Sequence, residues 1–266
     1  MGPRESLDDF APGSSGPMII GHRGYSSKAP ENTLSAFTLI REHGIGGVEL
    51  DVHRCGSGEI VVIHDDSLQR VAGTALPIAT TPFDQLREHD VGRWFDKKFA
   101  GEQVPLLEDV FEVLGGSCFI DIEIKHYRSP ASRPREGGVE AEVARLIRHH
   151  GLERRCIVSS FNPYIVRRVR AFDRAIVVGA IYGSGRDVTS LLRRSASHVL
   201  SGARVMKPHH RNATGSRIRR MHRFGRLVMP WTVDDEDLAR SLAGWGADAI
   251  ITNRPGEIRD ALRQAR

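Results

Sequence analysis

Residues 18–24, Met-Ile-Ile-Gly-His-Arg-Gly, and residues 47–52, Gly-Val-Glu-Leu-Asp-Val, decide the fold of this chain. In both stretches an apolar run leads directly to ionisable side chains, which is the pattern of a buried strand at the point where it ends. Parallel α/β folds place catalytic groups at such strand ends, because the strand is rigid there and the following loop is free to vary. The two stretches therefore predict a parallel sheet with ionisable groups along one edge.

Apolar, β-branched runs alternate with amphipathic segments along the rest of the chain. Strands are expected over residues 18–22, 47–52, 60–64, 118–124, 156–160, 175–182, 203–206, 227–233 and 248–252. Helical patterns lie between most of these runs, over residues 32–43, 106–114, 137–150, 163–171, 187–195, 214–224 and 235–244. Alternation of this kind is typical of βα units that build a parallel sheet.

The number of expected strands is one too many for a TIM (β/α)8 barrel. The connection between 47–52 and 60–64 is shorter than the crossover of about a dozen residues that a parallel neighbour needs. Segment 60–64 is therefore expected to return antiparallel beside 47–52. The other strands then close a TIM barrel.

The length of 266 residues suits a single barrel, and 40% hydrophobic with 27% charged residues is an ordinary soluble composition. We expect a flexible tail over residues 1–17 and one barrel domain over 18–266. A small insertion is expected over about 65–105, where the alternation stops and the aromatic residues Trp94, Phe95 and Phe99 gather.

The net charge of +5 is spread over helical patterns, as in Arg167-Arg168, Arg193-Arg194 and Arg219-Arg220. We interpret these arginines as solvated helix faces and expect no nucleic-acid partner, because a nucleic-acid binder needs clustered cations with interleaved aromatics. A basic surface is nevertheless compatible with a transient contact with a membrane surface.

The three cysteines, Cys55, Cys118 and Cys156, lack the spacing of metal ligands. Cys118 and Cys156 lie in apolar runs and fit core positions, which suits a reducing compartment. No run of about 18 apolar residues predicts a transmembrane helix. We therefore expect a cytoplasmic protein.

Ionisable residues gather at four strand ends, where they comprise His22, Arg23, Glu49, Asp51, His64, Glu123 and Lys125. Residues at i and i+2 of a strand share a face, so two such residues on one strand both project inward. Inward charges in apolar strands are costly unless they are paired or bind a cation. These strand ends therefore predict one polar site.

Glu49, Asp51 and Glu123 form an oxygen-rich set suited to one divalent cation, and both Mg²⁺ and Ca²⁺ fit. Arg23 and Lys125 supply the positive charge that a phosphate needs.

His22 and His64 are expected to exchange protons, because imidazole titrates near neutral pH. Together with the predicted metal site and cations, the two histidines indicate phosphodiester transfer.

These residues lie in motifs through which the chain resembles the glycerophosphodiester phosphodiesterase family. The matching motifs run in the family's order and are His22-Arg23-Gly24, Pro30-Glu31-Asn32-Thr33, Glu49-Leu50-Asp51-Val52, His64-Asp65, Glu123-Ile124-Lys125, Ser160-Phe161, Trp231-Thr232-Val233 and Thr252-Asn253-Arg254-Pro255. The resemblance implies a TIM-type barrel and metal-dependent hydrolysis of small glycerophosphodiesters to glycerol 3-phosphate and an alcohol, a reaction of glycerol and lipid metabolism.

The resemblance also implies roles for individual residues. His22 and His64 become the acid/base pair, the three carboxylates become the metal ligands, and Arg23 and Lys125 hold phosphate. In the family the first step is often drawn as attack by the substrate's own glycerol 2-hydroxyl, which gives a cyclic phosphate that water then opens.

Further positions are expected at the border of the site. Asn32 or Thr33 caps the helix near Leu34, and the resemblance places Glu31 or Asn32 beside the groups that contact substrate. It also turns Trp231, and to a lesser degree Phe161, toward the glycerol or the leaving group.

Asn253 replaces the Asp expected before Arg254-Pro255, and Lys207-Pro208-His209-His210 adds cations after the sixth strand. We expect both departures to affect the alcohol moiety rather than the chemistry.

Two other functions remain open. A lysophospholipase D or sphingomyelinase D-like enzyme would use a similar site but bind a lipid leaving group, which an exposed apolar rim on the 65–105 insertion would favour. A non-catalytic barrel that only binds phosphodiesters ranks lower, because it would be expected to have lost a histidine or a metal carboxylate.

Overall fold

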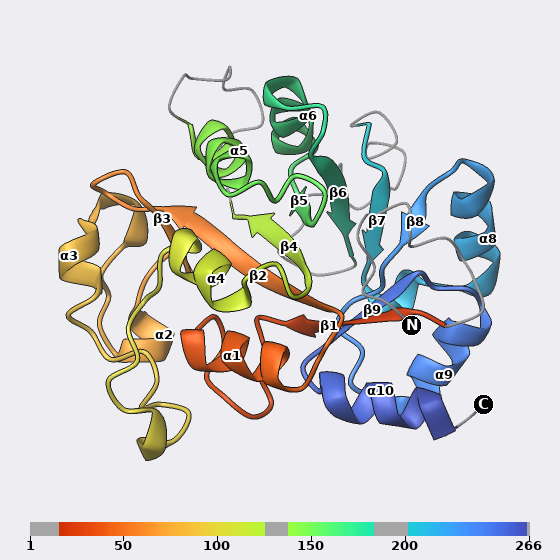
Figure 1. Ribbon diagram of the computed structural model, residues 1–266, viewed down its shortest axis with the longest axis horizontal. Coiled ribbons are helices and arrows are strands. Elements are labelled where there is room, and N and C mark those ends of the chain that lie inside the picture. The colour runs from red at the N-terminus through yellow and green to blue at the C-terminus, as the bar shows by residue number, and fades with distance from the viewer. Residues whose placement is uncertain (1–15, 126–137, 184–201, 265–266) are drawn as a thin grey trace.

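Eight parallel strands form the wall of a barrel, in the order β8-β7-β6-β5-β4-β2-β1-β9 (Figure 1). The structure is a computed structural model, and it describes residues 16–125, 138–183 and 202–264. The strands are β1 (Met18–His22), β2 (Gly47–Arg54), β4 (Phe119–Ile124), β5 (Cys156–Ser160), β6 (Val177–Tyr182), β7 (Val205–Pro208), β8 (Leu227–Val228) and β9 (Ala249–Thr252).

The barrel is nearly closed between β8 and β9. Backbone hydrogen bonds join the two segments, from Asp248 N to Val228 O at 3.0 Å and from Val233 N to Ile251 O at 2.9 Å. The predicted TIM barrel is thereby confirmed. The strand expected over 227–233 is shorter than predicted, because Pro230 has no N–H to donate to a ladder.

Helices cover the outside of the barrel (Figure 1), and they are α1 (Leu34–Glu42), α4 (Leu107–Leu114), α5 (Val139–His149), α6 (Pro163–Phe172), α8 (Gly215–Arg223), α9 (Glu236–Gly244) and α10 (Pro255–Gln264). The helix predicted over 187–195 lies outside the described residues. Helix α10 was not predicted, although proline is favoured in a first helical turn because its missing N–H has no helical partner there. None of the helices in the described part of the chain is long and apolar enough to cross a membrane.

The strands separate apolar from ionisable side chains by their two-residue period. On β2, Val48 and Leu50 pack into the core between strands and helices, whereas Glu49 and Asp51 alternate with them and are also buried. A second apolar cluster, which includes Ile20, Phe119, Ile157 and Met229, fills the barrel near the strand starts. The carboxyl ends of the strands are thereby left for polar groups.

The insertion returns along β2 before it leaves the barrel. Strand β3 (Ile60–Val62) pairs antiparallel with β2 in the register Val52↔Val62, which confirms the predicted return, although β3 ends two residues early. The segment beyond contains α2 (Gln69–Ala72), η2 (Ile78–Thr80), α3 (Phe83–Leu86) and η3 (Lys97–Phe99).

The insertion has an apolar cluster of its own, which includes Leu68, Ile78 and Leu86. Nearly all of the expected tail over 1–17 lies outside the described residues, so the division into a tail and one domain over 18–266 stays a prediction. Cys118 and Cys156 are buried and free, as expected for core residues.

Candidate active site

Three carboxylates meet where β2 and β4 end. Glu49 and Asp51 come from β2 and Glu123 from β4, and the sheet register pairs Asp51 with Glu123. One carboxylate oxygen of each residue lies within 4.8 Å of those of the other two, and all three residues are buried. The strand alternation therefore brings together the three predicted metal ligands.

Two predicted phosphate-binding cations lie against these carboxylates. Lys125 Nζ is 2.9 Å from Asp51 Oδ1 and 2.6 Å from Glu123 Oε1, and Arg23 Nε is 3.1 Å from Asp51 Oδ2. Burial opposes ionisation of Asp51, but Lys125 and Arg23 together hold its pKa well below the usual range. Burial and the neighbouring charge of Asp51 instead raise the pKa of Glu49 well above its usual value.

This donor set fits a divalent cation. Asp51 Oδ1 and Glu123 Oε1 are buried and accept no hydrogen bond of good geometry within the described part of the chain, despite the nearby Lys125. Glu49 meets two other carboxylates with only partial compensation, so a cation would favour its ionised form. An all-oxygen set of this kind is characteristic of hard cations such as Mg²⁺ or Ca²⁺.

His22 is the last residue of β1. Its Nε2 lies 3.9 Å from Glu49 Oε2, and its Nδ1 lies 2.8 Å from Asn253 Oδ1. Burial, assisted by the charge of Arg23, lowers the pKa of His22 to about 4. The imidazole is therefore neutral near neutral pH, which is the form that can accept a proton.

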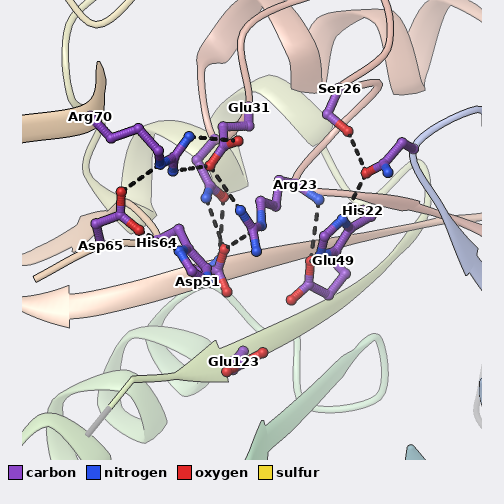
Figure 2. Close-up of polar contacts among 12 residues, drawn as sticks. His22, Arg23, Ser26, Glu31, Glu49, Asp51, His64, Asp65, Arg70 and Glu123 are labelled. Atoms are coloured by element: carbon purple, nitrogen blue, oxygen red, sulfur yellow. Dashed lines mark hydrogen bonds and ion pairs between the residues drawn. The ribbon is translucent and has the colours of Figure 1, made fainter. Parts of the chain in front are cut away.

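His64 follows β3 and has a carboxylate partner. Its Nδ1 lies 2.7 Å from Asp65 Oδ1, and its carbonyl oxygen lies 3.1 Å from Nε2 of the buried His53. Figure 2 shows His64 and His22 on either side of Arg23 and Asp51. An adjacent carboxylate orients an imidazole and stabilises the imidazolium that forms when the ring takes up a proton.

The loop after β1 holds Arg23 and Asn32 in the left-handed backbone region, each with φ of 57°. Such conformations cost about 1–3 kcal/mol and persist where surrounding contacts determine them. Asn32 N donates to Arg23 O at 2.9 Å, and Asn32 Nδ2 donates to Asp51 Oδ2 at 2.9 Å. Thr33 caps α1 by accepting from Ala36 N, so of the two cap candidates Thr33 is the cap and Asn32 supports Asp51.

Glu31 lies between two arginines (Figure 2). Its Oε1 accepts from Arg23 Nη1 at 2.9 Å and from Arg70 Nη2 at 2.6 Å. Arg70, on α2, also donates from Nε to Asp65 Oδ2 at 2.6 Å. The sequence reasoning missed Arg70, and the available signal was an arginine shortly after His64-Asp65 at the start of an insertion that must fold back on the barrel.

With this geometry in place, comparison with known proteins assigns the family. The sequence model of the glycerophosphoryl diester phosphodiesterase family matches residues 22–257. The chain belongs to this family. A glycerophosphodiester phosphodiesterase of Caldanaerobacter subterraneus subsp. tengcongensis is 32% identical over 249 residues, which cover 93% of this chain and 98% of that protein.

Solved structures agree with the assignment of this chain as a phosphodiesterase. A phosphodiesterase of Oleispira antarctica, in complex with the product sn-glycerol-3-phosphate, superposes with a TM-score of 0.76 at 28% identity, covering 93% of this chain and 97% of that one. A glycerophosphodiester phosphodiesterase of Agrobacterium tumefaciens gives a TM-score of 0.75 at 27% identity, with coverages of 92% and 99%.

A buried lysine lies inside the barrel of this phosphodiesterase. Lys207 Nζ is 2.6 Å from Asp121 Oδ2 and 2.9 Å from Ser159 Oγ. Burial opposes its charge, but Asp121 and Glu49 raise the pKa of Lys207 above its ordinary value. The sequence reasoning noted Lys207 as an added cation and expected it to affect the alcohol moiety, whereas the structure buries it within the barrel.

Aromatic side chains also lie near the carboxyl ends of the barrel strands. The rings of Phe161 and Trp231 meet edge to face with centroids 5.7 Å apart, and Trp231 Nε1 donates to Lys207 O at 3.0 Å. His209 packs against the same indole, with centroids 5.2 Å apart. The two predicted aromatic contacts are therefore adjacent, and the hydrogen bond orients the Trp231 ring.

Asn253 contacts a predicted catalytic residue. The replacement of Asp by Asn at this position was expected to affect the alcohol moiety alone, but the side chain hydrogen-bonds with His22 Nδ1. The contact arises because β1 and β9 are neighbours in the barrel, which places the loop after β9 beside the end of β1, and the expected effect on the alcohol moiety stays a prediction.

Proposed function

We propose that this phosphodiesterase hydrolyses glycerophosphodiesters to glycerol 3-phosphate and an alcohol, with His22 and His64 as the acid/base pair. The observation that carries the proposal is the placement of two side-chain-anchored imidazoles beside one buried cluster of carboxylates and cations. Each ring has Nδ1 engaged by Asn253 or Asp65, so Nε2 is the atom available for proton transfer.

Arg23 and Lys125 are proposed to bind the phosphate. Arg23 offers a fork of donors and Lys125 a compact charge, and both lie against Asp51. Glu49, Asp51 and Glu123 would hold one Mg²⁺ or Ca²⁺. When bound, the cation would supply positive charge to the phosphate oxygens as negative charge develops on them.

The protein's own groups support an order of proton transfers. Neutral His22 takes the proton of the glycerol 2-hydroxyl as that oxygen attacks phosphorus, and protonated His64 gives its proton to the departing alcohol oxygen. The first step leaves a cyclic phosphate, neutral His64 and protonated His22. In the second step His64 takes a proton from water as water attacks phosphorus and the bond to the glycerol 2-oxygen breaks, and His22 returns its proton to that oxygen, which yields glycerol 3-phosphate.

Other residues are proposed to act around the substrate. Trp231 and Phe161 provide an aromatic wall for the glycerol or the leaving group. Glu31 acts by orienting Arg23, with which it forms an ion pair at 2.9 Å. A cytoplasmic location and a transient contact with a membrane surface are part of the proposal and rest on the sequence.

A lysophospholipase D-like activity is the second candidate. Trp94 is 44% exposed and its ring meets Phe95, with centroids 5.8 Å apart. The Arg70 guanidinium lies 5.8 Å from the Trp94 ring centroid. Since Arg70 also contacts Asp65, it connects the apolar rim formed by Trp94 and Phe95 to the Asp65–His64 pair. The acyl chain that a lysolipid carries on its glycerol would bury the exposed indole face.

The deciding experiment is a coupled assay for glycerol 3-phosphate, with mass spectrometry for any acylated glycerol phosphate, in the presence of added Mg²⁺ or Ca²⁺. The substrates are glycerophosphocholine, glycerophosphoethanolamine, glycerophosphoglycerol and a lysolipid. Turnover of a water-soluble diester is expected. Release of an acylated glycerol phosphate from the lysolipid, without turnover of the water-soluble diesters, would support the second candidate, and failure with every water-soluble diester would refute the proposed activity.

A further inference from the structure

Asn253 is held by a carboxylate on the side away from His22. Asp234, in the segment between β8 and α9, accepts from Asn253 Nδ2 at 2.6 Å through Oδ2. Its Oδ1 accepts from the backbone N of Asn253 at 2.8 Å and from Thr252 Oγ1 at 2.9 Å. A row of three side chains, Asp234, Asn253 and His22, therefore leads to the ring nitrogen of His22.

The Asp234 carboxylate determines the orientation of the Asn253 side-chain amide. An ionised carboxylate only accepts hydrogen bonds, so the atom of Asn253 that faces Asp234 at 2.6 Å must be the NH₂ group. The amide oxygen then faces the other side, where the Ser26 hydroxyl donates to it at 2.9 Å. The reverse orientation would set two acceptors against each other, at the cost of a lost hydrogen bond to a charged group.

The amide orientation in turn decides the tautomer of His22. Nδ1 lies 2.8 Å from Asn253 Oδ1, which is an acceptor, so Nδ1 must carry the proton. In the neutral ring Nε2 is then the bare nitrogen. We propose that Asp234, acting through Asn253, locks His22 in the Nδ1–H tautomer, and that both are positioning residues for its proton transfer.

This inference rests on the proposed function only for the use that is made of Nε2. A ring in the other tautomer would present an N–H where a base is needed and could not accept the proton of the attacking hydroxyl. In this chain the Asp234 carboxylate does not contact His22 directly. Because it can only accept hydrogen bonds, it orients the Asn253 amide, and the amide oxygen in turn selects the Nδ1–H tautomer of His22. The departure at position 253 therefore affects the chemistry through the orientation of His22.

The lock predicts that the two positions can exchange their residues. Asp234→Asn removes the acceptor-only group and lets the Asn253 amide turn over. Asn253→Asp sets two carboxylates against each other at a separation of 2.6 Å. The double variant D234N/N253D restores one donor and one acceptor across the pair and places the carboxylate directly on Nδ1.

The test measures kcat on glycerophosphocholine together with nitrogen-15 NMR of the histidine rings, with His22 assigned among the 12 histidines by its loss in H22A. The wild type is expected to show a protonated Nδ1 and a bare Nε2. Each single variant is expected to lose about 10- to 100-fold in kcat, the usual cost of removing a group that orients a functional side chain. D234N should also show mixed tautomers.

The exchange variant is expected to recover the Nδ1–H tautomer and to lose less activity than either single variant. Multiplicative losses in the double variant would overturn the proposal, because uncoupled positions behave additively in free energy. A wild-type His22 protonated on Nε2 would also overturn it, whatever the activity. The NMR result does not depend on turnover, so it stands apart from failure of the proposed function.

One further variant covers the case in which D234N does not fold, and another is a matched control. Asn253→Ala removes the amide and leaves the hydrogen bond from Thr252 to Asp234 in place. This variant should therefore show a mixture of His22 tautomers even if D234N does not fold. An N253A protein with the wild-type tautomer and kcat would refute the lock. Asp237→Asn removes a carboxylate from the neighbouring α9 whose side chain is 92% exposed, and it should leave both readouts unchanged.

Discussion

Arg70 donates hydrogen bonds to both carboxylate oxygens of Glu31, from Nη2 to Oε1 at 2.6 Å and from Nη1 to Oε2 at 3.1 Å. The same guanidinium donates from Nε to Asp65 at 2.6 Å. One side chain of the insertion is thus connected to His64 through Asp65 and to Arg23 through Glu31. The insertion therefore contributes to the geometry of the site.

Arg70→Met is expected to lower kcat about 10- to 100-fold, because it removes the common partner of two groups that orient functional residues. Arg70→Lys should recover little, since a single ammonium cannot reproduce the bidentate fork. Steady-state kinetics and thermal unfolding check the result. Arg87→Met, an exposed arginine of the same insertion, is the matched control, and an equal loss in that variant would contradict the role of Arg70.

His22→Ala and His64→Ala are each expected to abolish turnover while the fold and metal binding survive, because the acid and the base act in the same steps. The checks are kcat, thermal unfolding and calorimetric titration with the metal. Near wild-type activity in either variant would show that the acid/base assignment is wrong.

Removal of divalent cations with EDTA is expected to abolish activity, and Mg²⁺ or Ca²⁺ should restore it. A cation present at 100 times its Kd should also raise the free energy of unfolding by about 2.7 kcal/mol, because it binds only the folded state. Glu123→Gln should weaken both effects, since it removes one carboxylate of the buried set. Full activity in excess EDTA would be incompatible with the metal site.

Acid stability should depend on Asp90 in the insertion. Its Oδ1 accepts from the backbone N of Arg93 and of Gly92, each at 2.9 Å, and its Oδ2 from that of Gly101 at 2.9 Å. These bonds, with that from Arg93 N foremost, lower the pKa of Asp90 to about 2. A lowered pKa adds stability above the unfolded value of about 3.9, and this stability is lost as pH falls toward 2.

Asp90→Asn should therefore lower the melting temperature at pH 7 and should make little difference at pH 2. Thermal unfolding across this pH range measures the difference between the variant and the wild type. A constant difference at all pH values would show that the charge of Asp90 has no part in it.

Trp94→Ala separates the two candidate classes of substrate. If the exposed indole contacts an acyl chain, the variant should raise KM for a lysolipid and leave KM for glycerophosphocholine unchanged. Equal effects on both substrates would assign Trp94 to the packing of the insertion, where its Nε1 donates to Val91 O at 2.8 Å.

The sequence allowed prediction of those parts of the site that depend on local periodicity. Glu49 and Asp51 alternate with apolar residues on one strand, so their shared face follows from the two-residue period. Contacts between distant segments left no such signal. Asn253 lies 231 positions from His22 along the chain, and Arg70 reaches Glu31 from an insertion without regular alternation.

Local chemistry also overrode periodicity at the strand expected over 227–233. The pattern there is a nearly continuous apolar run, but Pro230 cannot extend a ladder. Trp231 therefore lies just beyond β8, where a single bridge links it to His209. The predicted aromatic contact and its geometry thus arise from a strand end that the sequence pattern did not reveal.

The pairing of β1 with β9 affects when the site can form during synthesis of this enzyme. Strand β1 lies against β9 from Met18↔Ala249 to Gly21↔Thr252, and the side chain that holds His22 follows β9 directly. During synthesis His22, the proposed base, is made 231 residues before Asn253, whose side chain supports it. We therefore expect no hydrolysis by the nascent chain before β9 has been synthesised and has paired with β1.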